Sequence, residues 1–123
     1  MKIEVSNGEI LDKLSILEIK MEKITDEEKK ENIRKEFDLL VEAASAILSR
    51  EHELYQSLLE VNRKLWDIED RIRELERNKD FGSAFIETAR AVYYENDRRA
   101  AIKKKINEIT GSGLTEEKSY KPY

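Results

Sequence analysis

Residues 54–76 read LYQSLLEVNRKLWDIEDRIRELE, a run in which apolar residues recur every three or four positions. That spacing is the period of an amphipathic helix. The surrounding sequence extends the pattern, because residues 9–81 contain no glycine and no proline, the residues that most often interrupt a helix. The sequence therefore predicts an all-α protein built from long amphipathic helices.

Capping signals divide this pattern into segments. Ser6 and Glu9 have the spacing of a capping box, in which the two side chains satisfy free backbone N–H groups at a helix start, and Thr25 and Glu28 repeat it. Gly111 has the position of a C-terminal cap, followed by residues without helical periodicity. We therefore expect helices over three stretches: about residues 7–24, 26–78 and 83–110.

The middle stretch, residues 26–78, is either one helix or two helices broken near residue 50. No strong stop signal lies there, which favours one continuous helix. The stretches pair as elongated antiparallel hairpins with coiled-coil-like packing around a long central helix. They form one domain over residues 1–111, followed by an extended tail over residues 112–123.

The composition excludes several classes of function. Charged residues make up 41% of the chain, and 27 acidic residues are interleaved with 23 basic ones, so no basic field exists to attract nucleic acid. Cysteine is absent, which excludes disulfides and thiolate metal sites. No apolar run is long enough to span a membrane. We expect a cytoplasmic protein that binds no cofactor, no membrane and no nucleic acid.

Polar residues interrupt the apolar faces of residues 53–78 and 83–110, which the turn near Phe81 makes antiparallel. The residues at or near core positions of this seam are Asn62, Glu69, Glu76, Asn96 and Arg99. A half-buried carboxylate is costly unless it is paired. One interpretation is a polar network that fixes the helix register, as a buried asparagine does in coiled coils.

The second interpretation is a pocket for a phosphate, a nucleotide or a nucleotide sugar between the two helices. Its candidate residues are Glu69, Asp70, Arg73, Arg90, Tyr93, Asn96, Asp97 and Arg99. Carboxylates on facing helices can also hold divalent cations in helical bundles. The carboxylates available for that purpose are Asp67, Glu69, Asp70, Glu95 and Asp97. Arginines crowd the same region, so we predict no metal site, and we identify no catalytic residue.

The chain contains the stretches WDIED-x-IR (66–73), DFG (80–82), AR-x-VY (89–93) and ND-x-RA (96–100). Together they resemble the signature of an uncharacterised family of small helical proteins from bacteria and their phages. The resemblance spans nearly the whole chain. It implies no established activity, and the association of such proteins with sugar-transfer and cell-envelope genes is a hint about pathway only.

Two hypotheses about function follow from these observations. The favoured one is a non-enzymatic helical interaction or accessory protein, with a link to cell-envelope glycan assembly. The alternative is a small-molecule binding protein or enzyme that uses the polar seam. Because two-helix layers leave apolar surface uncovered, we also expect a homodimer or another protein partner. The predicted dimer interface consists of Val41, Leu48, Leu59 and Trp66.

Overall fold

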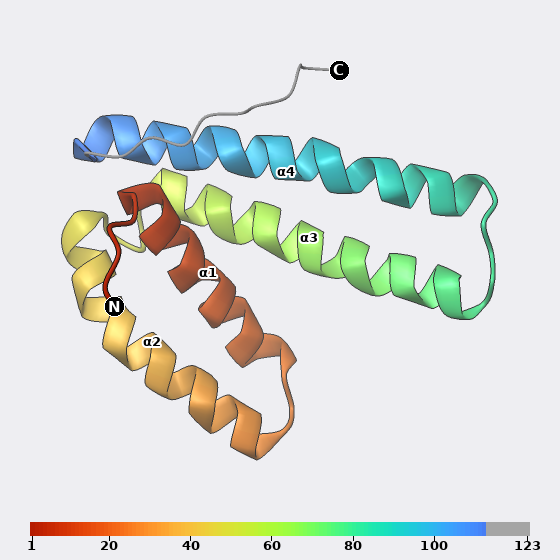
Figure 1. The fold of residues 1–123 in the computed structure, drawn as a ribbon, viewed down its shortest axis with the longest axis horizontal. Coiled ribbons are helices and arrows are strands. Elements are labelled where there is room, and N and C mark those ends of the chain that lie inside the picture. The colour runs from red at the N-terminus through yellow and green to blue at the C-terminus, as the bar shows by residue number, and fades with distance from the viewer. Residues whose placement is uncertain (113–123) are drawn as a thin grey trace.

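The amphipathic pattern forms helices throughout the computed structural model, which describes residues 1–112 (Figure 1). The helices are α1 (Asn7–Lys23), α2 (Glu27–Ile47), α3 (Glu53–Arg77) and α4 (Ser83–Thr110). No strand forms among these described residues, so the prediction of an all-α fold is confirmed. The tail predicted after Ser112 lies outside the described residues, and coiled-coil packing stays a prediction.

Short side chains cap the helices. The Ser6 hydroxyl accepts the backbone N–H of Glu9 at 3.1 Å at the start of α1. At the start of α2 the cap is Asp26 rather than the predicted Thr25, because the Asp26 carboxylate accepts the N–H of Lys29 at 2.9 Å. An ionised carboxylate is the stronger acceptor near the positive end of a helix dipole.

The middle stretch is two helices, so the continuous helix that we favoured over residues 26–78 is wrong. After Ile47 the chain becomes extended, and Leu48 has φ −154° and ψ 133°. His52 then caps α3, because its Nδ1 accepts the backbone N–H of Leu54 at 3.0 Å. Histidine is not among the residues that commonly cap a helix, and this signal is easily missed in a sequence.

The break is held by contacts from other helices. The Arg50 guanidinium pairs with the Glu18 carboxylate of α1 and lies 5.2 Å from the ring centroid of Phe37 in α2. The Tyr55 hydroxyl donates to the same carboxylate at 3.0 Å. Burial and the nearby Glu18 carboxylate raise the pKa of the Tyr55 phenol. These partners are distant in sequence, so the residues around the break do not reveal them.

Helix α1 lies at the centre of the fold and packs against each of the other three helices. Figure 1 shows two hairpins, α1–α2 and α3–α4, that meet at one end and diverge from it. Leu11, Leu14, Leu17 and Ile19 are all buried, and their spacing covers more than one face of α1. A helix that is apolar on several faces belongs in an interior position.

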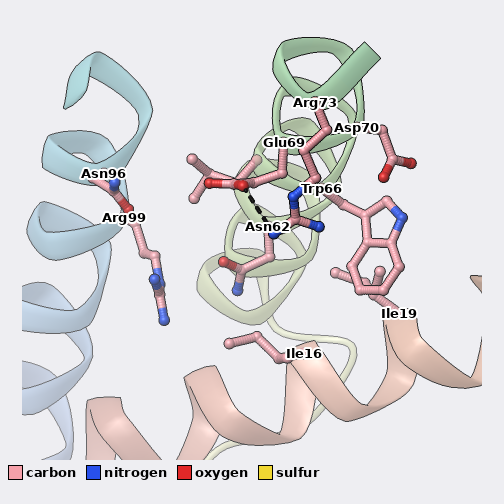
Figure 2. A pocket seen from close by; sticks show the side chains of 10 residues that line it. Ile16, Ile19, Asn62, Trp66, Glu69, Asp70, Arg73, Asn96 and Arg99 are labelled. Atoms are coloured by element: carbon pink, nitrogen blue, oxygen red, sulfur yellow. Dashed lines mark ion pairs between the residues drawn. The ribbon is translucent and has the colours of Figure 1, made fainter. Parts of the chain in front are cut away.

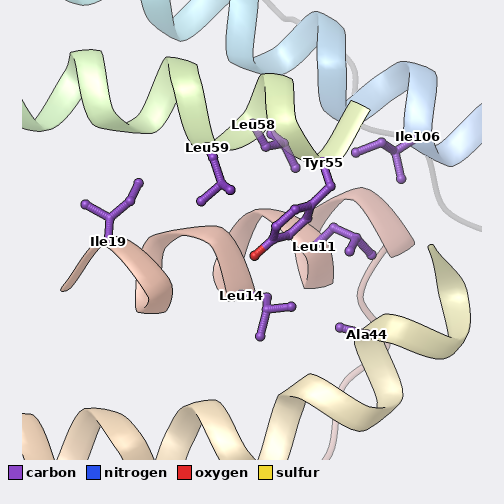
Figure 3. Packing of buried hydrophobic residues seen from close by; sticks show 8 residues of the cluster. All are labelled: Leu11, Leu14, Ile19, Ala44, Tyr55, Leu58, Leu59 and Ile106. Carbon is purple, nitrogen blue, oxygen red and sulfur yellow. The ribbon is translucent and has the colours of Figure 1, made fainter. Parts of the chain in front are cut away.

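The hydrophobic core gathers where the two hairpins meet (Figure 3). Its buried residues are Leu11, Leu14, Ile19, Ala44, Tyr55, Leu58, Leu59 and Ile106. Leu59, a predicted dimer contact, is part of this core, and Val41, Leu48 and Trp66 pack against it. Leu59 is therefore buried within one chain, and the homodimer itself stays a prediction.

The seam between α3 and α4 differs from the predicted one. Glu69 and Glu76, which we predicted at the seam, are exposed. Leu75 is only 2% exposed, and it lies near the end of α3, where α4 is the neighbouring helix. The buried or half-buried apolar residues of this part of α3 recur at heptad spacing: Val61, Leu65, Ile68, Ile72 and Leu75. The seam follows these side chains because burying them costs no charge desolvation.

Gly8 allows the first turn of α1 to approach α4 closely. Its backbone N–H donates to Asn107 Oδ1 at 2.7 Å, and a Cβ atom at Gly8 would lie 2.5 Å from the carbonyl oxygen of Lys103. That oxygen belongs to the backbone of a helix and cannot rotate away. The glycine is therefore required by the packing of α1 on α4.

We expect Gly8→Ala to lower the free energy of unfolding by about 1–3 kcal/mol, the usual cost of overpacking. Urea denaturation followed by circular dichroism measures this loss. Gly82→Ala is the matched control, since a Cβ there would meet only Asp80 Oδ1 at an ordinary 3.5 Å. The control should lose less than about 1 kcal/mol. Equal midpoints for Gly8→Ala and the unmodified protein would contradict the close approach.

Candidate ligand-binding site

A buried carboxylate on α1 joins three helices. The Asp12 side chain is 1% exposed and forms a two-point ion pair with Arg99 of α4. Arg99 Nε donates to Asp12 Oδ1 at 3.0 Å, and Asn62 of α3 donates its Nδ2 to the same oxygen at 2.9 Å. A carboxylate this deeply buried is tolerated only when opposite charge and hydrogen bonds compensate for lost water. Asp12 meets both conditions.

Further polar contacts extend this arrangement. Lys103 Nζ lies 2.7 Å from Glu9 Oε2 and 3.8 Å from Asp12 Oδ2. The Ser15 hydroxyl donates to the backbone carbonyl of Asp12 at 2.7 Å and accepts from Asn62 Nδ2 at 2.8 Å. We call these residues the Asp12 cluster: Glu9, Asp12, Ser15, Asn62, Arg99 and Lys103. Its carboxylates and cations balance, so the cluster carries no net charge.

A cavity of about 330 Å³ lies beside the Asp12 cluster, between α1, α3 and α4 (Figure 2). Its lining residues are Ile16, Ile19, Asn62, Leu65, Trp66, Glu69, Asp70, Arg73, Asn96 and Arg99. Asn62 and Arg99 belong to both the cluster and the cavity wall. The buried Asp12 carboxylate therefore sets the position of an arginine that faces the cavity.

The cavity combines apolar surface with polar groups. Ile16, Ile19 and Trp66 supply apolar surface from α1 and α3, and Arg73 and Glu69 form an ion pair at 3.4 Å on α3. Small-molecule sites have this composition, with mainly apolar walls and a few placed polar groups. Among its described lining residues there is no serine, threonine, histidine or lysine. The wall can bind and orient a molecule but offers no such nucleophile for covalent catalysis.

The structure brings together only part of the predicted site. The predicted residues that line the cavity are Glu69, Asp70, Arg73, Asn96 and Arg99. Arg90, Tyr93 and Asp97 do not line it. Arg90 and Tyr93 are exposed, and a hydrogen bond from Arg90 Nε to the Tyr93 hydroxyl at 3.3 Å raises the pKa of Arg90. Ligand binding by any of these residues stays a prediction.

Sequence reasoning missed the contribution of α1. We expected Arg99 and Asn62 to meet partners across the α3–α4 seam, but both bind Asp12 of α1. The signal was present, since Asp12 and Ser15 continue into Ile16 and Ile19 at helical spacing, on a face beside the predicted apolar one. A carboxylate on a helix that is otherwise apolar on several faces requires a buried partner.

The carboxylates considered for a metal do not gather around one point. Within residues 1–112 no group of three or more acidic or histidine side chains is placed to hold a metal ion. Asp67 lines a separate, more open hollow between α3 and α4, with Arg71, Glu87 and Thr88 among its neighbours. Asp70, three residues further along α3, instead lines the cavity beside α1.

Fold and site together define an all-helical protein in which a partly open cavity lies between α1, α3 and α4, beside a buried ion-pair cluster. A model of the family of unknown function DUF6165 matches residues 1–123, and the chain belongs to that family. Searches of curated proteins and of solved structures found no match to the chain. None of the helices within residues 1–112 combines the length and hydropathy needed to cross a lipid bilayer.

Proposed function

We propose that this protein binds a small polar molecule in the cavity between α1, α3 and α4. The observation that supports the proposal most directly is the two-point pairing of Arg99 with the buried Asp12 carboxylate at the cavity wall. Immobilising a long side chain on binding costs about 0.5–1.5 kcal/mol. Folding has already ordered Arg99, so a ligand that contacts it avoids much of this cost.

The cavity also suits this role in size and composition. Its volume of about 330 Å³ falls at the lower end of the range for small-molecule sites. Trp66 offers a broad apolar face, while Asn62, Asn96 and Arg73 offer hydrogen-bonding groups from two helices. A molecule with both polar and apolar surface would contact each kind of wall.

A thermal-shift screen of the purified protein tests the proposal. The panel should contain nucleotides, amino acids, neutral sugars and sugar phosphates. A compound present at a hundred times its Kd adds about 2.7 kcal/mol to stability, which raises the Tm of a small domain by several degrees. Trp66 is the single tryptophan, so its fluorescence reports binding at the cavity independently of stability. No response from any class would contradict the proposal.

Arg73→Ala and Arg71→Ala form a matched pair for locating the response. Both arginines are exposed on α3 and pair with a glutamate of the same helix at 3.4 Å, but only Arg73 lines the cavity. We expect Arg73→Ala to weaken binding of the responding compound about tenfold or more, as loss of a hydrogen bond from a charged donor does. Arg71→Ala should leave the Kd unchanged. Equal affinities for both variants would place binding elsewhere.

A second candidate function, an interaction module, is supported by a different surface. Ile86, Tyr93 and Tyr94 of α4 are 56%, 42% and 47% exposed. Ile86 and Tyr93 lie on one helix face, seven residues apart, and the Tyr94 ring is next to the Tyr93 ring. Exposed apolar side chains on one face are typical of protein–protein contacts. A homodimer or another protein partner would cover them. The link to cell-envelope glycan assembly stays a prediction from the resemblance alone.

A further inference from the structure

We infer that the cavity takes an uncharged ring that carries several hydroxyl groups, such as a neutral monosaccharide. This inference rests on the proposed function and names the ligand class of the same site. It departs from the phosphate, nucleotide or nucleotide sugar that the arginine-rich sequence suggests. Three features of the cavity wall support it: paired charges, unpaired neutral polar groups, and one apolar side.

Most charges of the wall already have partners within the chain. Arg99 is paired with Asp12, and Arg73 is paired with Glu69. A phosphate that contacts either arginine would lie close to the carboxylate that the arginine already pairs with, and the two negative charges would repel each other. Asp70 is the one charged lining residue whose side chain forms no hydrogen bond or ion pair within residues 1–112, and its charge is negative. The wall therefore offers an anion no unpaired cation.

Three neutral polar groups of the wall remain able to form hydrogen bonds to a ligand. Neither the Trp66 indole N–H nor the Asn96 amide forms a side-chain hydrogen bond within the described part of the chain. Asn62 donates through Nδ2 to Asp12 and Ser15, which leaves its carbonyl oxygen to accept from the cavity. A hydroxyl group both donates and accepts. A ring bearing several hydroxyls can thus satisfy these groups while the ion pairs stay intact.

The apolar side of the cavity suits one face of such a ring. Figure 2 shows the Trp66 indole beside Ile19 at one end of the cavity, with Asn96 and Arg99 on the opposite wall. A pyranose has an apolar face of C–H groups and a polar edge of hydroxyls. Tryptophan combines a large apolar face with a single N–H donor, so it can contact both parts of the ring.

Glucose, glucose 1-phosphate and protonated glucosamine form a matched test set, because they share a ring and differ in charge. Galactose and N-acetylglucosamine extend the neutral group. Titrations are followed by the fluorescence of Trp66 and by its indole N–H signal in NMR spectra of the full chain. We expect saturable binding of at least one neutral sugar. Its phosphorylated counterpart should bind at least tenfold more weakly.

Asn96→Ala tests the wall directly, and Asn32→Ala on α2 is its control. Both asparagines are exposed, so neither change should alter the helical content or the Tm. Asn96→Ala should weaken binding of the responding neutral sugar about tenfold, and Asn32→Ala should not change it. Equal binding by the two variants would overturn the assigned contact and, with it, the inference.

The remaining outcomes separate the inference from the proposed function. Tighter binding of glucose 1-phosphate or glucosamine than of glucose overturns the neutral-ligand inference but supports a small-molecule site. The same holds if no sugar responds while another class of the broader screen does. If no compound of any class perturbs Trp66 or the Tm, both the inference and the proposed function fail.

Discussion

Asp12→Ala is expected to lower the free energy of unfolding by about 3–5 kcal/mol, the cost of leaving buried charge without its partner. The variant removes the carboxylate that pairs with Arg99 and accepts from Asn62. It also removes the Asp12 carboxylate from beside Lys103, whose side chain is 10% exposed. The cationic side chains would then face a small void where their counter-charge had been. Equilibrium urea unfolding at neutral pH measures the loss.

Two comparisons make this result specific. Asp38→Ala removes an exposed carboxylate of α2 and should change stability by less than about 0.5 kcal/mol. The double variant Asp12→Ala, Arg99→Ala should lose less than the sum of its single losses, because residues in one ion pair are not additive. A loss below about 1 kcal/mol for Asp12→Ala would show that the ion pair does not hold α1 against α4.

Leu14→Ala is expected to lower the free energy of unfolding by about 2–5 kcal/mol, the range for deleting a buried leucine side chain. Leu14 is 0% exposed and lies in the core formed where the two hairpins meet (Figure 3). A cavity there would loosen α1, and α1 contacts every other helix. The same urea titration gives the loss, and the denaturant slope should remain unchanged.

Leu39→Ala provides the matched control on the neighbouring helix α2. Leu39 is 85% exposed, so its truncation removes little buried surface and should cost under about 0.5 kcal/mol. Similar losses for the two leucine variants would contradict the central position of α1. A large loss at Leu39 alone would instead indicate that α2 is covered by a partner chain.

Local pattern predicted the helices better than their packing. The spacing of apolar residues and the caps at Ser6 and Gly111 act over a few residues, and the structure has helix ends at both positions. The break before α3 depends on Arg50 reaching Glu18, which lies on another helix. A stop signal that consists of a long-range ion pair cannot be read from the residues around it.

The candidate site was predictable on α3 and α4 but not on α1. Glu69 and Arg73 on α3, and Asn96 on α4, each lie at helical spacing from the apolar residues of their own helix. The residue pattern therefore selected them. Asp12 is 87 positions from Arg99 in the chain, and many other carboxylates were equally available as partners. Only the packing of α1 between the two hairpins chooses among them.

Backbone hydrogen bonding and apolar periodicity are local properties, so the residue pattern was enough to predict that this chain is helical, that α1 starts after Ser6 and that α4 ends before Gly111. The same pattern correctly selected Asn62 and Arg99 as polar residues at packed positions, but it wrongly placed the exposed Glu69 and Glu76 there. Packing between helices, by contrast, makes α1 the central helix, pairs Asp12 with Arg99 and leaves a cavity beside them. These features depend on how separate helices share buried surface and charge, which no local pattern specifies.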